Sequence, residues 1–246
     1  MEHPILFISI ILEALGLPVP HTLTGHPIPG PWPSLEQLCT PYMTYTWLVM
    51  AFWIIVPKLT MGRLEIIPGK GQNFWEIVIG GMEDFFAENM GRDRARMMFP
   101  FLATFGLYIV VGNMIGLIPG FMSPTSSLNI TLGMTIMVWV THHVLGIRYH
   151  GVKYIKHFLG PVPVLIPLML PIELISNAAR LLSLSFRLFG NIMAKEILLS
   201  VLFLLAGAYF APLPILCLGV LVSLIQALVF VLLALLYCAG AMEHAH

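Results

Sequence analysis

An apolar stretch in the second half of the chain carries charged side chains of the kind that control proton movement. Between residues 171 and 206 they are Glu173, Arg180, Arg187, Lys195 and Glu196. A charge at the centre of a bilayer costs about 2.5–3.5 kcal/mol on insertion scales, so charges kept there usually face a protein interior or an ion path. The Arg187 guanidinium stays protonated at any accessible pH, whereas the Glu196 carboxyl can take up and release a proton. A fixed cation of this kind favours the ionised form of a carboxylate brought to it by another chain.

Helical spacing arranges these groups into a stripe. At 100° per residue the first three charges fall on one line of a helix, with Ser183 and Asn191 close beside it. Glu196 follows Arg187 by nine residues, which is about 13 Å along the axis and on roughly the opposite side. We therefore expect Arg187 and Glu196 to serve different compartments rather than to pair with each other.

The helix that positions the stripe is longer than a bilayer is thick. No proline lies between Ile172 and Ala206, and those 35 residues would measure about 52 Å against a hydrocarbon core of about 30 Å. The helix must either tilt by roughly 55°, beyond the usual range, or break. Gly190 is the one interior glycine at which it would bend.

Composition excludes an ordinary soluble domain. Of 246 residues, 58% are hydrophobic and only 10% are charged, where soluble domains have about 25%. The alternating pattern of barrel strands is absent, so the chain is predicted to be an all-α, polytopic membrane protein. The twelve basic and twelve acidic residues cancel, which gives no indication of a nucleic-acid partner.

No motif predicts a metal, a cofactor or ATP chemistry. Cys39, Cys217 and Cys238 lack metal-ligand spacing. His142 and His143 point about 100° apart on a helix, with no Glu or Cys beside them, so we expect them at the membrane interface. A phosphate loop of the GxxxxGK[ST] type does not occur, and the chain is therefore expected to be non-catalytic.

Apolar runs and punctuating prolines predict five membrane helices in three regions. Residues 1–40 form a short helix and loop outside the membrane, 41–160 the first spans, and 161–242 a long helical hairpin. The five predicted spans are residues 41–56, 97–118, 129–145, 172–206 and 215–237, and an amphipathic helix over 72–90 lies in the membrane surface.

Basic residues predict the orientation. They gather in two loops that five spans place on the same side, and are absent from residues 1–40, 119–128 and 207–214. By the positive-inside rule the amino terminus lies outside and the carboxyl terminus in the cytoplasm. The residues concerned are Lys58, Arg63, Lys70, Arg92, Arg94, Arg96, Arg148, Lys153 and Lys156.

Several motifs together resemble subunit a of the F-type ATP synthases, the stator that abuts a rotating ring of c subunits. The most specific is SFRLFGNIMAKEILL at 185–199, followed by LVSLIQALVFVLLALLY at 221–237. Weaker likeness extends through PGKGQNFWE, VGNMIGLIP and SLNITL, so about residues 40–242 are covered. The resemblance implies a c-subunit ring and a b-type peripheral stalk as partners, in the cell inner (plasma) membrane.

The resemblance also implies roles for individual residues. Arg187 matches the family arginine that faces the ring carboxylate, between two offset aqueous half-channels. The motifs place outer half-channel or interface residues at Glu196, Asn191 and Gln226, and inner-side residues at Glu173, Asn177, Arg180 and Ser183. Lys195 and Asn113 are further candidates for the proton path.

Three positions depart from patterns found in relatives. Lys195 stands where some relatives have glycine, Gly219 where some have histidine, and Gly116 where some have aspartate. The outer proton path is therefore expected to use a different set of groups. The sequence leaves open whether Lys195 tunes Glu196 or extends to the membrane interface.

Two other function classes fit the charged helix less well. A secondary transporter would use Arg187 to bind an anionic substrate, but the chain shows no inverted repeat. An intramembrane hydrolase would need paired catalytic groups, and neither HExxH nor GxSxG occurs.

Overall fold

The structure, a computed structural model, describes residues 41–62, 65–118, 121–151, 154, 166–206 and 212–242. The helix and loop predicted for residues 1–40 lie outside this part. The described chain is helical throughout and contains no strand. Its elements are α3 (Pro41–Met61), α4 (Lys70–Met90), α5 (Arg92–Ile115), the short 3-10 helix η2 (Pro124–Ser126), α6 (Leu128–His150), α8 (Ile166–Ala206) and α9 (Pro212–Met242).

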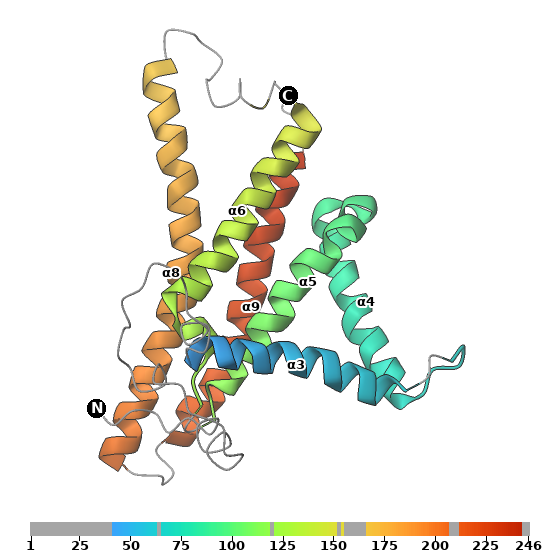
Figure 1. Ribbon diagram of the computed structural model, residues 1–246, viewed down its shortest axis with the longest axis vertical. Coiled ribbons are helices and arrows are strands. Elements are labelled where there is room, and N and C mark those ends of the chain that lie inside the picture. The colour runs from blue at the N-terminus through green and yellow to red at the C-terminus, as the bar shows by residue number, and fades with distance from the viewer. Residues whose placement is uncertain are drawn as a thin grey trace, which may run out of the picture.

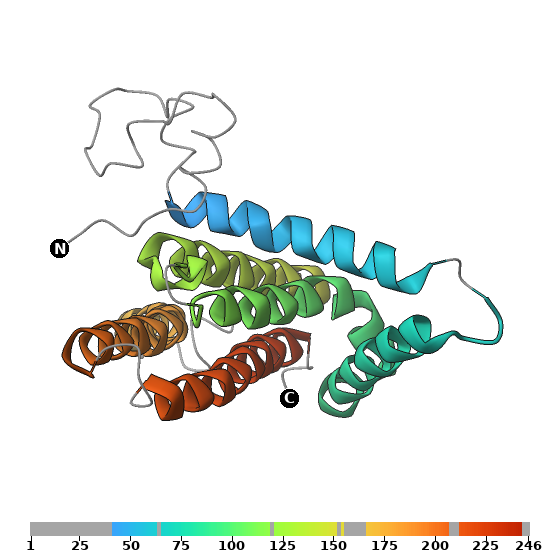
Figure 2. The same ribbon diagram turned by 90° about the horizontal axis from the view of Figure 1, so that it is seen from below.

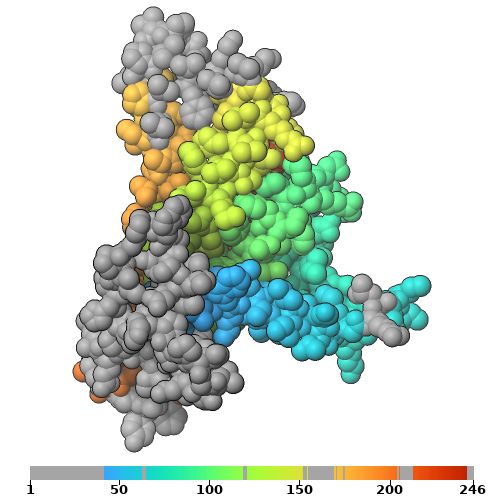
Figure 3. Space-filling model, viewed as in Figure 1, coloured from blue at the N-terminus to red at the C-terminus, as the bar shows by residue number. Residues whose placement is uncertain are grey.

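The helices form layers. Seen end-on in Figure 2, α3 lies on one side, α5 and α6 form the middle, and α8 and α9 lie on the other side. In Figure 1, α6, α8 and α9 run lengthwise while α3 runs across, near the lower end of α6. Figure 3 shows α6 on the surface between α8 and α5. α9 contacts α4, α5, α6 and α8, so it is the central helix of the bundle.

Among the described residues, four helices are long and apolar enough to cross a membrane, which confirms the predicted polytopic all-α class. They are Tyr42–Met61, Arg92–Ile115, Leu128–His150 and Leu213–Met242. α8, which covers the fourth predicted span, is 41 residues long, carries the charged stripe and is not among these four. The predicted spans are thus present as helices, with α4 as an additional helix over the predicted amphipathic segment.

α3 and α6 extend beyond the ends of their predicted spans. α3 continues through Pro57 to Met61, since proline is tolerated in membrane helices where neighbouring groups satisfy the backbone. α6 continues past residue 145 to His150 and stops before Gly151, whose φ of 56° favours glycine.

α8 resolves the alternative between tilting and breaking. It is helical without interruption through Gly190, and includes Pro171 near its start. At 1.5 Å per residue the 41 residues measure about 62 Å, twice the thickness of a hydrocarbon core. The break that the sequence left open at Gly190 therefore does not occur.

Part of the hydrophobic core lies between α5 and α9. Phe105 and Phe230 meet across it with ring centroids 6.0 Å apart, and Phe230 is fully buried. Leu184, Leu188 and Ile192 of α8 are buried and spaced by four residues, on the side of α8 that packs against α6 and α9. Residues at this spacing share one face of a helix, so the opposite face of α8 is left outward.

Candidate functional site

The outward face of α8 carries Arg187. Its side chain is exposed, as are Arg180, Ser183 and Asn191 of the predicted stripe. Within the described residues the one ion pair joins Arg96 to Glu83 at 3.0 Å, so Arg187 forms none there. An exposed cation that forms no ion pair among the described residues is available to an acidic group on another chain.

At the start of the stripe, two side chains pair within the helix. The Asn177 amide donates to the Glu173 backbone oxygen at 3.0 Å and to its carboxylate Oε1 at 3.1 Å. Asn177 is buried and Glu173 is half-buried. These two predicted inner-side residues are thus in contact, while Ser183 lies farther along the exposed face.

Glu196 turns away from the Arg187 face and meets the segment between α5 and α6. Its Oε1 accepts a hydrogen bond from the backbone N–H of Ser123 at 3.0 Å. The Ser123 hydroxyl in turn donates to the Gly112 carbonyl of α5 at 3.0 Å. The carboxyl group is therefore attached to the turn at one end of the bundle, as expected if Arg187 and Glu196 serve different compartments.

Lys195 points into the protein. Only 8% of the residue is exposed, and its Nζ donates to the Asn113 carbonyl at 3.3 Å and to Ser223 Oγ at 3.4 Å. These partners belong to α5 and α9, so the ammonium bridges two helices. The ammonium therefore points into the helix bundle rather than outward, as extension to the membrane interface would require.

The three positions that depart from relatives meet in this one place. A Cβ added at Gly219 would lie 3.3 Å from Lys195 Cδ and 2.5 Å from Leu117 Cδ2. A Cβ added at Gly116 would lie 3.2 Å from Glu196 Oε1. The tightest contact of such a Cβ is with Leu117 at Gly219 and with Ser123 Cβ, at 2.7 Å, at Gly116. The two glycines therefore allow Leu117 and Ser123 to pack beside Lys195 and Glu196, which the sequence alone did not reveal.

Besides Lys195 and Glu196, the polar line of α5, α8 and α9 includes Asn191, Gln226 and Asn113. Asn191 donates to Gln226 Oε1 at 2.7 Å, across from α8 to α9. Gln226 is 3% exposed, and its Nε2 is buried with no hydrogen-bond partner among the residues described. Asn113 has the same property at Nδ2, while its Oδ1 accepts from Thr125.

Sequence reasoning missed three members of this network, namely Ser123, Thr125 and Ser223. Ser223 precedes Gln226 by three residues on the same face of α9, a spacing that would have identified it. Ser123 and Thr125 lie in the turn before α6, where no periodic pattern marks them.

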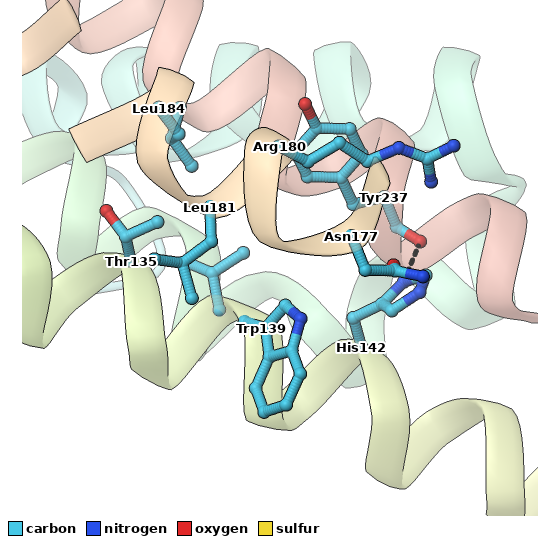
Figure 4. Close-up of a pocket in the computed structure, with 9 residues that line it drawn as sticks. Thr135, Trp139, His142, Asn177, Arg180, Leu181, Leu184 and Tyr237 are labelled. Atoms are coloured by element: carbon cyan, nitrogen blue, oxygen red, sulfur yellow. Dashed lines mark hydrogen bonds between the residues drawn. The ribbon is translucent and has the colours of Figure 1, made fainter. Parts of the chain in front are cut away.

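A second cluster lies between α6, α8 and α9, at the other end of the stripe. Figure 4 shows side chains from the three helices converging on a cavity of about 20 Å³. Its polar lining includes His142, Asn177 and Arg180, and Arg180 Cζ lies 6.0 Å from the ring centroid of Tyr237. The predicted inner-side residues Asn177 and Arg180 are therefore brought together. Over the described part of the chain, no group of three or more His, Cys, Asp or Glu residues could hold a metal ion.

Comparison with known proteins agrees with these features. Residues 43–239 match the family model described as ATP synthase A chain. The ATP synthase subunit a of Desulfotalea psychrophila is 69% identical over the full length of both chains. Those of Syntrophobacter fumaroxidans and Desulfosudis oleivorans are 47% and 48% identical, again over the full length of both chains.

Proposed function

The chain belongs to the ATP synthase A chain family, and on this premise we propose that it is the proton-conducting stator subunit of a rotary F-type ATP synthase. Membership makes the chain a membrane subunit of the complex. The observation that carries the finer proposal is the exposed Arg187, which has no ion pair among the described residues. ATP chemistry belongs to other subunits, since no phosphate-binding loop occurs here.

Arg187 acts as a fixed electrostatic element. A carboxylate carried past it by the c-subunit ring gains roughly 4 kcal/mol in its ionised form at a separation of about 4 Å and an effective dielectric constant of about 20. The ring carboxylate therefore releases its proton on reaching Arg187. Because the guanidinium keeps its own proton, it cannot pass protons directly from one compartment to the other.

The outer half-channel is formed by the buried polar groups that follow Arg187. Its members are Asn191, Gln226, Lys195, Asn113 and Glu196, of which Glu196 exchanges protons with the outside. Two observations support this path: the Asn191–Gln226 hydrogen bond, and the unsatisfied amide donors of Gln226 and Asn113. Lys195 is held at this path by its hydrogen bonds to the Asn113 carbonyl and Ser223 Oγ.

The inner half-channel is formed by Glu173, Asn177, Arg180 and Ser183, which precede Arg187 on α8. Arg180 lies about 10 Å before Arg187 along the axis, and Glu196 about 13 Å after it. The two proton paths are therefore offset, and a proton must travel with the ring to move from one to the other. The free energy of each charge that crosses the membrane in this way changes by about 2.3 kcal/mol per 100 mV of membrane potential.

Assembly follows from this role. The exposed Arg187 face of α8 meets the c-subunit ring, and a b-type peripheral stalk holds the chain against rotation. The distribution of basic residues supports an outer amino terminus and a cytoplasmic carboxyl terminus.

Reconstitution tests the stator role against a transporter. The chain alone in liposomes is expected to accumulate no anionic substrate, because Arg187 needs the ring carboxylate to act. With the ring, the stalk and the soluble sector, the same preparation is expected to pump protons on addition of ATP. Proton movement is followed by quenching of a pH-sensitive dye, and anion uptake by radiolabelled organic and inorganic anions. Saturable anion uptake by the isolated chain would favour the transporter instead.

A further inference from the structure

Three hydrogen-bond contacts join the turn before α6 to α5, but the two hydroxyls in them supply only two protons. The Ser123 hydroxyl donates to the Gly112 carbonyl at 3.0 Å and lies 2.7 Å from Thr125 Oγ1. Thr125 Oγ1 in turn contacts Asn113 Oδ1. Each hydroxyl carries one proton, and carbonyl oxygens carry none. In this orientation of the Asn113 amide, one of the three contacts therefore brings two oxygens together with no proton between them.

The opposite orientation of the Asn113 amide supplies the missing proton. The amide oxygen and nitrogen exchange places by a half-turn about the Cβ–Cγ bond, and the hydrogen-bond network decides between the two orientations. When Nδ2 faces Thr125, the amide donates to Thr125 Oγ1, which donates to Ser123 Oγ. The Ser123 proton stays on the Gly112 carbonyl, so each contact has one proton. The half-turn also gives a partner to Nδ2, which in the first orientation is buried and has none among the described residues.

The chain of hydrogen bonds lies in a tightly packed contact between the turn and α5. Its three side chains are fully buried, so a contact that lacks a proton there is costly. α5 presents Gly112 and Gly116, which lie four residues apart on one face of the helix. A Cβ added at Gly112 would lie 3.1 Å from Pro124 Cγ, and one at Gly116 would lie 2.7 Å from Ser123 Cβ. The turn is therefore fixed directly on α5.

Ser123 is held by its carbonyl and its hydroxyl, and it presents its N–H to Glu196. The carbonyl accepts hydrogen bonds from the Ser126 N–H at 3.1 Å and from the Ser126 hydroxyl at 2.8 Å. The hydroxyl is fixed by Gly112 and Thr125. The N–H donates to Glu196 Oε1 at 3.0 Å. A displacement of Ser123 would therefore displace the donor that holds the Glu196 carboxyl.

From this arrangement we infer that Thr125 is a positioning residue for Glu196, which acts through Ser123 and accepts a hydrogen bond from Asn113 Nδ2. The inference rests on the proposed function, in which Glu196 exchanges protons with the outside. It changes the part of Asn113, whose amide then acts on Glu196 through the turn and leaves Gln226 as the unsatisfied donor of the outer path. The chain of hydrogen bonds ends on the Gly112 carbonyl, which has no proton to pass on, so it holds Glu196 without carrying protons itself.

Thr125→Val tests this role, because valine keeps the branched shape of threonine and lacks its hydroxyl. At equal amounts of assembled complex, the rate of ATP synthesis after an acid–base transition is expected to fall roughly tenfold, since Asn113 and Ser123 each lose a buried hydrogen bond. Thr125→Ser keeps the hydroxyl and is expected to retain the unsubstituted rate. Thr104→Val is the control on α5, where the hydroxyl donates to the Pro100 carbonyl of its own helix, and it is also expected to retain that rate.

Combination with Glu196→Gln separates positioning of Glu196 from a general structural role. Adding Thr125→Val to Glu196→Gln is expected to cause no further fall in rate, whereas independent effects would multiply. Multiplied losses overturn the inference, as does failure of both Thr125→Val and Thr125→Ala to assemble. An unsubstituted rate in Glu196→Gln contradicts the proposed role of Glu196 itself. A slow Glu196→Gln together with an unaffected Thr125→Val contradicts only the inference.

Solid-state NMR measures the orientation of the Asn113 amide directly. In a complex labelled with ¹⁵N in asparagine side chains and ¹³C at threonine Cβ, Asn113 Nδ2 is expected to lie within about 4 Å of Thr125 Cβ. The corresponding ¹⁵N–¹³C contact is expected to disappear in Thr125→Val, in which residue 125 carries no label. If the unsubstituted complex shows no contact that this substitution removes, the inferred orientation is wrong.

Discussion

Alanine in place of Arg187 is expected to abolish ATP-driven proton pumping and proton-driven ATP synthesis. The substitution removes the charge that forces the ring carboxylate to release its proton, worth roughly 4 kcal/mol, or on the order of a thousandfold in that equilibrium. ATP hydrolysis by the soluble sector is expected to remain, because its chemistry lies on other subunits. Pumping is measured by dye quenching in inverted vesicles, and hydrolysis by phosphate release from detergent-solubilised complex.

Arg148→Ala is the matched control for this substitution. Arg148 is an exposed arginine near the end of α6, apart from the polar line on α8 and α9. It is expected to leave pumping unchanged at equal amounts of assembled complex. Pumping by Arg187→Ala at the level of this control would contradict the assigned role.

Glutamine in place of Glu196 is expected to slow ATP synthesis by on the order of tenfold to a hundredfold, because a positioned acid–base group typically contributes a hundredfold or more. The amide oxygen of glutamine can accept the Ser123 N–H as the carboxylate does, so the turn keeps its attachment. What is lost is proton exchange with the outer water. The measurement is the rate of ATP synthesis by proteoliposomes after an acid–base transition. It is repeated at several values of the pH on the side of the membrane that Glu196 is proposed to face.

Glu88→Gln serves as the control for this second substitution. Glu88 is an exposed carboxylate on α4, far along the chain from the Lys195 cluster. Its synthesis rate is expected to follow that of the unsubstituted complex at each pH. If Glu196→Gln does the same across the whole range, Glu196 is not on the path.

Local patterns predicted the elements well. Apolar runs identified the spans, and the 100° periodicity of α8 separated Arg187 from the buried face formed by Leu184 and Leu188. The ends of α3 and α6 were predicted too early. A proline or a pair of histidines reads as a stop signal, whereas neighbouring helices allow each helix to continue.

Contacts between distant segments could not be predicted in this way. Periodicity tells which face of α8 Lys195 occupies, but not that α5 and α9 offer a carbonyl and a hydroxyl there. The space at Gly116 and Gly219 likewise depends on which helices pack together. The three positions at which the chain departs from patterns in relatives are separate in the sequence but lie together in the structure.

His142 illustrates the same limit. In sequence it is one of two polar residues near the end of an apolar run, which is typical of an interfacial position. Its hydrogen bond to the Tyr237 carbonyl joins residues 95 positions apart, and no local signal predicts it. The prediction that His142 and His143 lie at the membrane interface therefore did not include this contact.

The central claim is that the Arg187 face of α8 meets an acidic partner helix, and disulfide trapping tests it most directly. Two serines on α8 offer matched positions: Ser183 is exposed beside Arg187, whereas Ser185 is buried and donates to Thr131. Each is changed to cysteine in a complex without native cysteines, together with a cysteine one turn from the ring carboxylate. We expect Ser183→Cys to form a disulfide with the ring and Ser185→Cys to form none. An assembled complex in which Ser183→Cys does not react with the ring would contradict the account.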